Sequence, residues 1–298
     1  MVAGAEDDQT LRAVHRALAS GLAAAVLTGR QEKLEAAARA ASLDLDAVRV
    51  VPTGSVEESA VAAVREISDG RAHLLMKGKL HTSELLEAVL DRQAPLRTGR
   101  TLSHVFIHDL DRYPRLLMVT DGGINLAPDE ETLFQITQNA VALARLFVPR
   151  PRVAIVSALD FVSAKLPSTV LARRIQERAA SEIPEADVQG PLTLDQVVSE
   201  VACRRKGVSG PAAGRADIAV VPYIEMGNAL VRALIYLAGA RAAGVVIGGR
   251  CPIVLASRSD SEETKFFSLA LGLLAYDIRF GPPGEPVEIS PEALALVG

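Results

Sequence analysis

The sequence predicts an α/β protein with a largely parallel sheet, divided into two domains. Short β-branched runs alternate along the chain with longer segments whose apolar residues recur at helical spacing, which is typical of strands joined by crossover helices. Most junctions between an expected strand and the next helix carry Gly, Ser, Thr or Asn. A chain of 298 residues also exceeds the length at which one hydrophobic core keeps growing, so two domains are expected.

The first half of the chain supplies five of the expected strands. Each is a short apolar or β-branched run: AAVL, VRVV, HLLM, VFI and LLMV, at 24–27, 48–51, 73–76, 105–107 and 116–119. Helical apolar spacing predicts helices at 8–20, 31–42, 56–68 and 83–90. Pro128-Asp129-Glu130 then begins a longer helix over 130–147 and is the expected hinge, while Pro149 and Pro151 end that helix.

The second half continues the alternation. VAIV, IAVV, VVI and IVL predict strands at 153–156, 218–221, 245–247 and 253–255, and helices are expected at 168–181, 226–237 and 262–276. The last helix is expected to return to the first domain. We therefore expect a first domain of residues 1–133 with 250–298, and a second domain of residues 134–249.

Composition excludes several classes of protein. The formal net charge of −4 gives no basic field, so nucleic acid is not expected as the main partner. Two cysteines, Cys203 and Cys251, support neither a disulfide framework nor a zinc site. The acidic start MVAGAEDDQT does not resemble a signal peptide, and the apolar region 233–248 is interrupted by Arg241 and several glycines, so no membrane span is expected. We expect a soluble cytoplasmic protein.

Two junctions in the first half carry cations at the end of a strand or beside a glycine turn. Lys77-Gly78 follows a strand and precedes a helix expected to be capped by Thr82 or Ser83, an arrangement that favours an anion site but equally fits a capped helix with a surface lysine. In RTGR, Arg97 and Arg100 flank a glycine turn, which suits phosphate or a nucleotide tail, although arginines in loops are usually solvated.

Polar residues after other strands allow both a ligand-binding and a structural interpretation. His104 and His108 would share one face of a strand, as metal ligands can, but no carboxylate-rich motif accompanies them, so a structural or surface function is favoured and no metal is expected. The glycines of TDGGINLAP allow close approach of a ligand or simply a tight turn. The same alternatives apply to QGPLTLD (189–195) and VPYIEMGNAL (221–230).

The stretch LASRSDSEETK joins an expected strand to an expected helix through Ser257 and Arg258. By itself, an arginine there fits a surface salt bridge as well as a ligand contact. The chain has no nucleotide P-loop, no G-x-G-x-x-G, no G-x-S-x-G and no serine–histidine set that suggests a triad. The candidate chemistry is therefore the handling of anions without an obvious protein nucleophile.

Seven blocks taken in order resemble the phosphate acetyl/butyryltransferases, and most closely their short, butyryltransferase-like branch. The blocks are MKGKLHTS, LRTGRTLSHVF, LLMVTDGGINLAPD, RVAIVSALDFVSAKLPST, QGPLTLD, GRADIAVVPYIEMGN and PIVLASRSDSEETK, and they span roughly residues 74–274. Their joint order is far more specific than any single block.

The resemblance implies a fold and an activity. The fold would be two three-layer αβα domains, like those of isocitrate and isopropylmalate dehydrogenases, with an active-site cleft between them. The activity would be acyl-CoA + phosphate ⇌ acyl phosphate + CoA for acetyl to butyryl groups, by direct attack in a ternary complex. A homodimer is implied, and coenzyme A is a substrate, so no bound cofactor is expected.

The same resemblance assigns site residues. Arg258 would hold phosphate, and Ser257 would hydrogen-bond the thiol or the developing oxyanion; Asp260 is the first choice for the base that takes the thiol proton. The remaining substrate-binding candidates are Lys77, Thr82, Arg97, Ser103, Asn125, Ser157, Gly190, Pro191, Asp195, Glu225 and Asn228.

Three positions depart from the family pattern. Thr264 stands where the acetyltransferase branch has a catalytic aspartate, and Gln189 and Tyr223 each replace an aspartate. They leave open an alternative: a catalytically degenerate relative that binds CoA or acyl phosphate as a sensor or scaffold. The metal-dependent β-decarboxylating dehydrogenases share a similar architecture, but the aspartate cluster that they need is not found in this sequence.

Overall fold

The computed structural model describes residues 1–91, 96–280 and 288–289, which form two compact units. The first unit holds the described residues of 1–100 and 243–280, and the second holds 101–242 with 288–289. These divisions fall at 100/101 and 242/243, whereas the sequence analysis placed them at 133/134 and 249/250. The difference arises because an antiparallel hairpin at 103–120 pairs with a strand of the second unit.

The sheet of the first unit is parallel except at one end. Its strand order is β3-β2-β1-β4-β11-β10, and all neighbours are parallel except β11 and β10. The strands are β1 (Val2–Ala3), β2 (Val26–Gly29), β3 (Arg49–Pro52), β4 (Leu75–Lys77), β10 (Arg241–Ile247) and β11 (Ile253–Val254). The carboxyl ends of the five parallel strands therefore lie at one edge of this sheet, where ligands bind in such folds.

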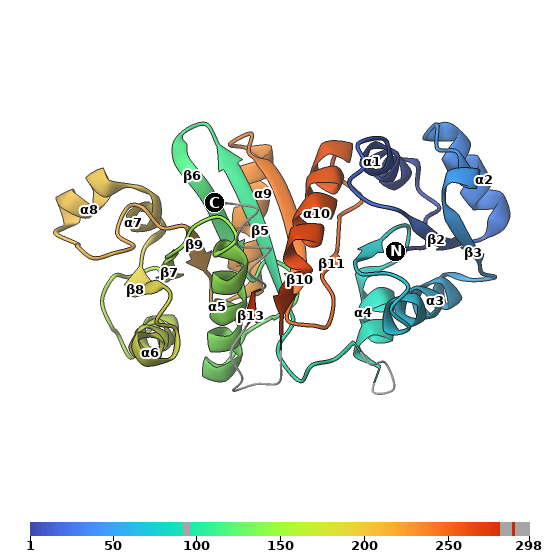
Figure 1. Cartoon of the computed structure of the whole chain (residues 1–298). Helices are drawn as coiled ribbons and strands as arrows, with labels where there is room; N and C mark the ends of the chain where they lie inside the picture. Colours follow the sequence, from blue (N-terminus) through green and yellow to red (C-terminus); the bar gives the residue numbers. More distant parts are fainter. Residues whose placement is uncertain (92–95, 281–287, 290–298) are drawn as a thin grey trace. The chain divides into compact units, whose positions relative to one another are not determined.

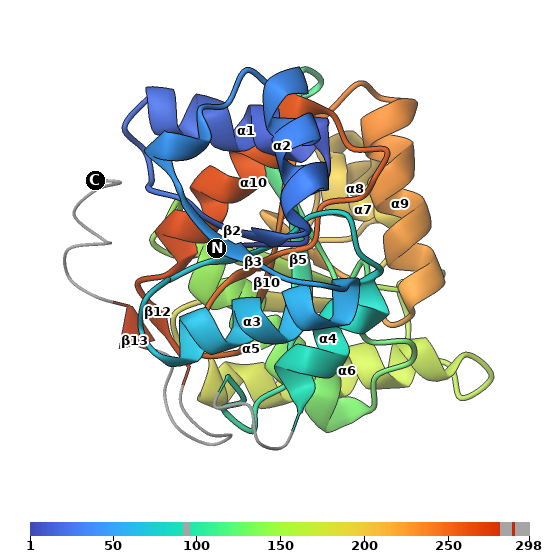
Figure 2. The same ribbon diagram turned by 90° about the vertical axis from the view of Figure 1, so that its right-hand side faces the viewer.

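Helices cover both faces of that sheet (Figures 1 and 2). They are α1 (Asp8–Ala19), α2 (Gln31–Ala40), η1 (Leu45–Ala47), α3 (Val56–Ser68), α4 (Thr82–Leu90) and α10 (Glu262–Ala275). α1, α2 and α10 lie on one face, and α3 and α4 lie on the other. The core on the first face includes Leu11, Leu27 and Val254, which are fully buried.

The second unit has the strand order β5-β6-β9-β7-β8. Its elements are β5 (Ser103–Leu110), β6 (Tyr113–Thr120), α5 (Glu130–Ala144), β7 (Arg152–Val156), α6 (Pro167–Glu182), β8 (Asp187–Leu192), α7 (Leu194–Val198), α8 (Glu200–Lys206), β9 (Ile218–Val220) and α9 (Ile224–Tyr236). β5 and β6 form the antiparallel hairpin, and the other neighbours are parallel.

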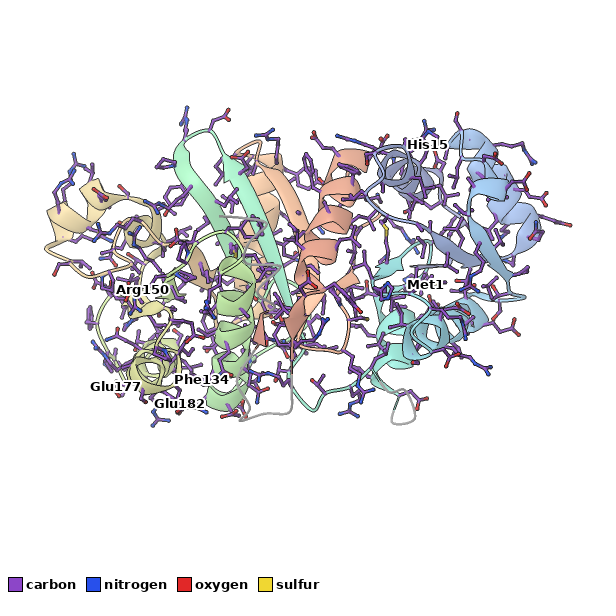
Figure 3. All side chains as sticks on the ribbon, in the orientation of Figure 1. Met1, His15, Phe134, Arg150, Glu177 and Glu182 are labelled. Carbon is purple, nitrogen blue, oxygen red and sulfur yellow. The ribbon has the colours of Figure 1, made fainter. Side chains whose placement is uncertain are left out.

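Both faces of the second sheet are also covered. α7 and α9 contribute Val197 and Val231 to one core cluster with residues of β5, β6, β7 and β9. α5 and α6 pack against each other; Phe134 of α5 lies on the side toward α6 (Figure 3), and the Arg178 guanidinium carbon is 3.8 Å from the centroid of its ring. The chain continues through β12 (Ile278–Arg279) and β13 (Glu288–Ile289). Within the described ranges, no helix is long and apolar enough to cross a membrane.

The predicted α/β class is confirmed, and every predicted strand and long helix overlaps an observed one. Sequence reasoning missed the strands β1, β8, β12 and β13 and the short helices η1, α7 and α8. β1 is two residues long, so it shows no alternation of apolar and polar residues. β8 contains Gly190 and Pro191, which are depleted in strands, and the sequence left close approach of a ligand and a tight turn as the alternatives for this segment.

Candidate active site

In the first unit, Ser257 and Arg258 lie in a closed turn that directly follows β11. The Ser257 backbone N–H donates to Asp260 Oδ2 at 2.7 Å, and the Asp260 N–H donates to the Ser257 carbonyl at 3.2 Å. Ser261 then caps α10 by accepting a hydrogen bond from the Thr264 N–H at 3.1 Å. The turn therefore holds Ser257 at the carboxyl edge of the parallel strands, next to the start of a helix.

Asp260 stabilises this turn. It is 8% exposed, and its carboxylate accepts the Ser257 N–H. Its assignment as the base for the thiol stays a prediction.

Arg258 is exposed, and no described residue forms a hydrogen bond or an ion pair with it. Ser257 is half-buried, and its Oγ is 3.0 Å from the Ser259 Oγ. A guanidinium with all its donors free can bind a phosphate through two parallel hydrogen bonds. The geometry therefore suits an incoming anion better than the surface salt bridge that the sequence left open.

Lys77 ends β4, the strand beside β11, and its side chain is buried. Its Nζ donates to the carbonyls of Gly78 and Leu80, both at 3.3 Å. Burial lowers the pKa of Lys77, and the positive charges of Arg258 and Lys265 lower it further. Lys77 is thus close to the Ser257–Asp260 turn and is not the surface lysine that the alternative interpretation required.

The cap of the following helix differs from the prediction. His81, not Thr82 or Ser83, is the N-cap of α4, and Glu84 accepts the His81 N–H at 2.6 Å. The predicted cap was wrong because the Glu84 side chain accepts the backbone N–H of His81, the residue before the predicted cap. Thr82 is therefore the first residue of the helix, and it is exposed. Arg97 is exposed as well, whereas Arg100 is buried.

In the second unit, the TDGG stretch after β6 forms a turn around the Asp121 carboxylate. This carboxylate accepts the N–H groups of Gly123 at 2.7 Å and Ile124 at 3.0 Å, and the Asn125 amide at 2.6 Å. Burial raises the pKa of Asp121, and these hydrogen bonds act against that rise. The Asn125 amide also donates to the Leu102 carbonyl at 2.8 Å. The tight-turn interpretation therefore describes this segment.

The start of α9 packs against the same turn. A Cβ on Gly227 would lie 2.2 Å from the Asp121 carbonyl oxygen, so the glycine permits this close approach. Asn228 Nδ2 is 3.4 Å from the Gly122 carbonyl, and Glu225 is exposed in the first helical turn. The structure thus brings Gly227 and Asn228 against the Asp121 turn.

Two predicted serines of the second unit have buried hydroxyl groups. Ser103 Oγ accepts a hydrogen bond from Asn139 Nδ2 at 3.0 Å, and Ser157 Oγ is 2.9 Å from Ser168 Oγ. Both hydroxyl groups therefore have protein partners in this conformation, and their assignment to substrate stays a prediction.

The segment 189–195 contains the other candidates of the second unit. Gly190 lies in β8, where its N–H donates to Gln176 Oε1 at 2.8 Å; Pro191 follows it in the strand. Asp195 is exposed and forms an ion pair with Lys206 at 2.8 Å, and that lysine lowers the pKa of Asp195. Gln189 holds a neighbouring loop, because its amide donates to the Ser209 carbonyl at 2.9 Å.

His104 and His108 occupy buried positions on β5, as the structural interpretation expected. His108 Nδ1 is 3.1 Å from the Leu117 carbonyl oxygen, and the Nε2 atoms of both rings have no hydrogen-bond partner among the described residues. Burial lowers the pKa of His104 to about 3 and that of His108 to about 4. Both rings are therefore neutral in the folded protein near neutral pH.

This burial predicts an acid-sensitive second unit. The unfolded chain binds protons near pH 6.5 and the folded chain near 3, so the stabilisation by neutral His104 is complete above pH 6.5 and is lost as the pH falls below it. At about pH 5 the loss from this one histidine is about 2 kcal/mol. Chemical denaturation above pH 6.5 and at about pH 5 measures the free energy of unfolding at each pH. The loss between the two should be smaller in a His104→Leu variant than in the wild type by about this amount.

The matched control for this experiment is His15→Leu. His15 lies on the outer side of α1 and is exposed (Figure 3), so its loss should leave the pH dependence unchanged. An unaltered pH dependence in His104→Leu would contradict the prediction.

Sequence reasoning missed Lys265, which is 2% exposed in α10. Its Nζ donates to the Asp260 carbonyl at 2.6 Å and to Gln9 Oε1 at 3.4 Å. A lysine four residues after a helix cap usually projects into solvent, so the residue pattern gave little indication that Lys265 is buried. The one indication that it belongs to the site was its place in the block that contains Ser257 and Arg258.

Comparisons with known proteins agree with the resemblance drawn from the seven blocks. The family model described as phosphate acetyl/butaryl transferase matches residues 53–273. A probable phosphate butyryltransferase of Bacillus subtilis (strain 168) is 43% identical over 276 residues, which make up 92% of this chain and 92% of that protein. A phosphate acetyltransferase of Rhizobium meliloti is 40% identical over 270 residues, or 90% of this chain and 85% of that protein.

A solved structure gives the same result for the fold. The crystal structure of a branched-chain phosphotransacylase from Enterococcus faecalis V583 has 33% sequence identity and a TM-score of 0.82, and the match covers 91% of this chain and 96% of that one. The matched residues 53–273 contain Lys77, Ser257, Arg258 and Lys265, which the first unit places at the carboxyl edge of its sheet. The chain belongs to the phosphate acetyl/butaryl transferase family.

Proposed function

We propose that this protein catalyses the reversible transfer of a short acyl group, acetyl to butyryl, between coenzyme A and inorganic phosphate. The observation that carries the proposal is the Ser257–Arg258 turn, in which an exposed guanidinium without a described partner lies near the buried Lys77. Family membership supports it, since relatives of both the acetyl and the butyryl type match most of the chain.

The proposed reaction proceeds without a covalent enzyme intermediate. A phosphate oxygen attacks the thioester carbonyl, the new C–O bond forms, and the C–S bond breaks; the proton of the phosphate passes to the leaving CoA thiolate. Arg258 holds the phosphate, and the Ser257 hydroxyl donates to the thioester sulfur or to the developing oxyanion. Catalysis then depends on positioning two anionic substrates and stabilising charge in the transition state.

In the reverse direction, the CoA thiol must lose its proton before it attacks acyl phosphate. Asp260 is our candidate base, although its carboxylate also stabilises the Ser257 turn. A strong base is not essential, because a thiol with a pKa near 8.5 is partly ionised at neutral pH. Thr264 does not take this function in the proposal: its N–H and hydroxyl contribute to the cap of α10.

The proposal extends to substrate binding, assembly and location. Exposed Thr82, Arg97, Glu225 and Asn228 are free to contact substrate, whereas Asp195 would first have to exchange its ion pair with Lys206. We propose a homodimer that binds no cofactor. We also propose a cytoplasmic location, where the free cysteines Cys203 and Cys251 would stay reduced.

The test is release of free thiol from acyl-CoA substrates of two to six carbons, with and without phosphate. We expect phosphate-dependent release, and the chain length with the highest kcat/KM identifies the preferred acyl group. Absence of phosphate-dependent release with every substrate would refute the proposal. Calorimetric binding of CoA without turnover would instead support the sensor or scaffold alternative.

A further inference from the structure

Two buried ammonium groups lie close to the Ser257–Arg258 turn. Lys77 is 5% exposed and Lys265 is 2% exposed, although lysine is rarely buried without an acidic partner. Lys265 comes from the second turn of α10, and Lys77 ends the neighbouring strand β4. The two ammonium groups are near enough to each other for the charge of Lys265 to lower the pKa of Lys77. The first unit therefore concentrates positive charge behind the exposed guanidinium of Arg258.

Neither ammonium group has a charged hydrogen-bond partner among the described residues. Lys265 donates to the Asp260 carbonyl and the Gln9 side-chain amide, and Lys77 donates to the carbonyls of Gly78 and Leu80 at the long distance of 3.3 Å. Burying an ammonium without an ion pair is costly. An anionic ligand close to the two ammonium groups would offset this cost.

Two carboxylates, Asp7 and Asp260, lie near enough for their charges to act on Lys77. Both carboxylates already have other partners. Asp7 caps α1 by accepting the Thr10 N–H at 2.9 Å, and Asp260 accepts the Ser257 N–H at 2.7 Å. A phosphate dianion at Arg258 would bring negative charge near the two ammonium groups, which these carboxylates do not hydrogen-bond.

We propose that Lys265 is a positioning residue whose buried positive charge, together with Lys77, sets the affinity of the Ser257–Arg258 turn for phosphate and for the phosphoryl end of acyl phosphate. This rests on the proposed function for its choice of ligand. Lys265 acts from behind the turn, through the Asp260 carbonyl, and does not touch the substrate. Its charge distinguishes the phosphate substrate from the uncharged thioester group of acyl-CoA.

The test compares Lys265→Gln with Lys265→Met. Gln keeps a hydrogen-bond donor for the Asp260 carbonyl but removes the charge, whereas Met removes both. We expect both variants to weaken the binding of inorganic phosphate at least tenfold, measured by calorimetry and by the phosphate-dependent rise in Tm. In the thiol-release assay, the KM for phosphate should rise to a similar extent, while the KM for acyl-CoA changes less than twofold.

Ser268→Ala is the matched control on the same helix. Ser268 is buried, and its Oγ accepts the Gly244 N–H at 2.9 Å and donates to the Thr264 carbonyl at 2.7 Å; among the described residues it forms no hydrogen bond with Ser257, Arg258 or Asp260. Its loss should lower Tm without changing phosphate affinity. Wild-type phosphate affinity in Lys265→Gln, or equal losses for both substrates, would overturn the proposal, as would a wild-type protein that does not bind phosphate. Because binding is measured without turnover, an inactive wild type whose phosphate binding depends on Lys265 would refute the proposed function alone.

Discussion

Substitution of Arg258 by alanine should lower kcat/KM for phosphate by about 10²–10³, the usual effect of removing one preorganised donor from a charged transition state. The guanidinium is exposed, and the described structure gives it no protein partner, so its loss should leave the fold intact. Its expected function is to hold two phosphate oxygens while the thioester carbonyl is attacked. Steady-state thiol release at varied phosphate concentrations measures the effect.

Two further variants make this experiment specific. Arg258→Lys keeps the charge but loses the planar pair of donors, so it should recover part of the phosphate affinity and little of kcat. Arg39→Ala removes another exposed arginine of the first unit, at the end of α2, and should have wild-type kinetics. Full activity and unchanged phosphate dependence in Arg258→Ala would contradict the assignment.

Most of the fold could be predicted because its elements are long enough to show a period. The helices over 8–20, 56–68 and 262–276 were predicted within about one residue of the observed bounds of α1, α3 and α10. β1 could not be predicted from periodicity, because Val2 and Ala3 are too few to alternate. Its place in the middle of the first sheet depends on pairing with β2 and β4, which are distant in sequence.

The candidate site was predictable in part for the same reason. Ser257, Arg258 and Lys77 stand at junctions where the sequence allowed anion binding beside a structural alternative, and the order of the seven blocks indicated their family. The hydrogen bond from Ser257 to Asp260 and the burial of Lys265 could not be predicted. The hydrogen bond is local, but the residue pattern does not determine which side chain closes the turn. The burial of Lys265 depends on the packing of α10 against α1, where its Nζ reaches Gln9, and a linear pattern does not contain such tertiary contacts.

Gly78 shows how closely tertiary packing constrains the site. The loop after β1 crosses the end of β4 so tightly that a Cβ on Gly78 would lie 2.2 Å from the Gly4 carbonyl oxygen and 2.8 Å from the Ala3 carbonyl oxygen. Two backbone hydrogen bonds hold this crossing: Gly78 N–H to the Ala3 carbonyl at 2.8 Å, and Lys79 N–H to the Gly4 carbonyl at 2.7 Å. Both contacts are with backbone, which cannot move aside as a flexible side chain can.

Gly78→Ala should therefore lower the free energy of unfolding by about 3–5 kcal/mol, because the new methyl group would force apart β1 and β4 and break these hydrogen bonds. The same displacement would move Lys77, so phosphate affinity should fall as well. Gly21→Ala is the control: Gly21 has φ +68° with open space around it, and its replacement should cost about 1–2 kcal/mol from backbone strain alone. Denaturant unfolding measures both variants. Equal losses of stability in the two would mean that the crossing at Gly78 relaxes easily, and that β1 does not fix the position of Lys77.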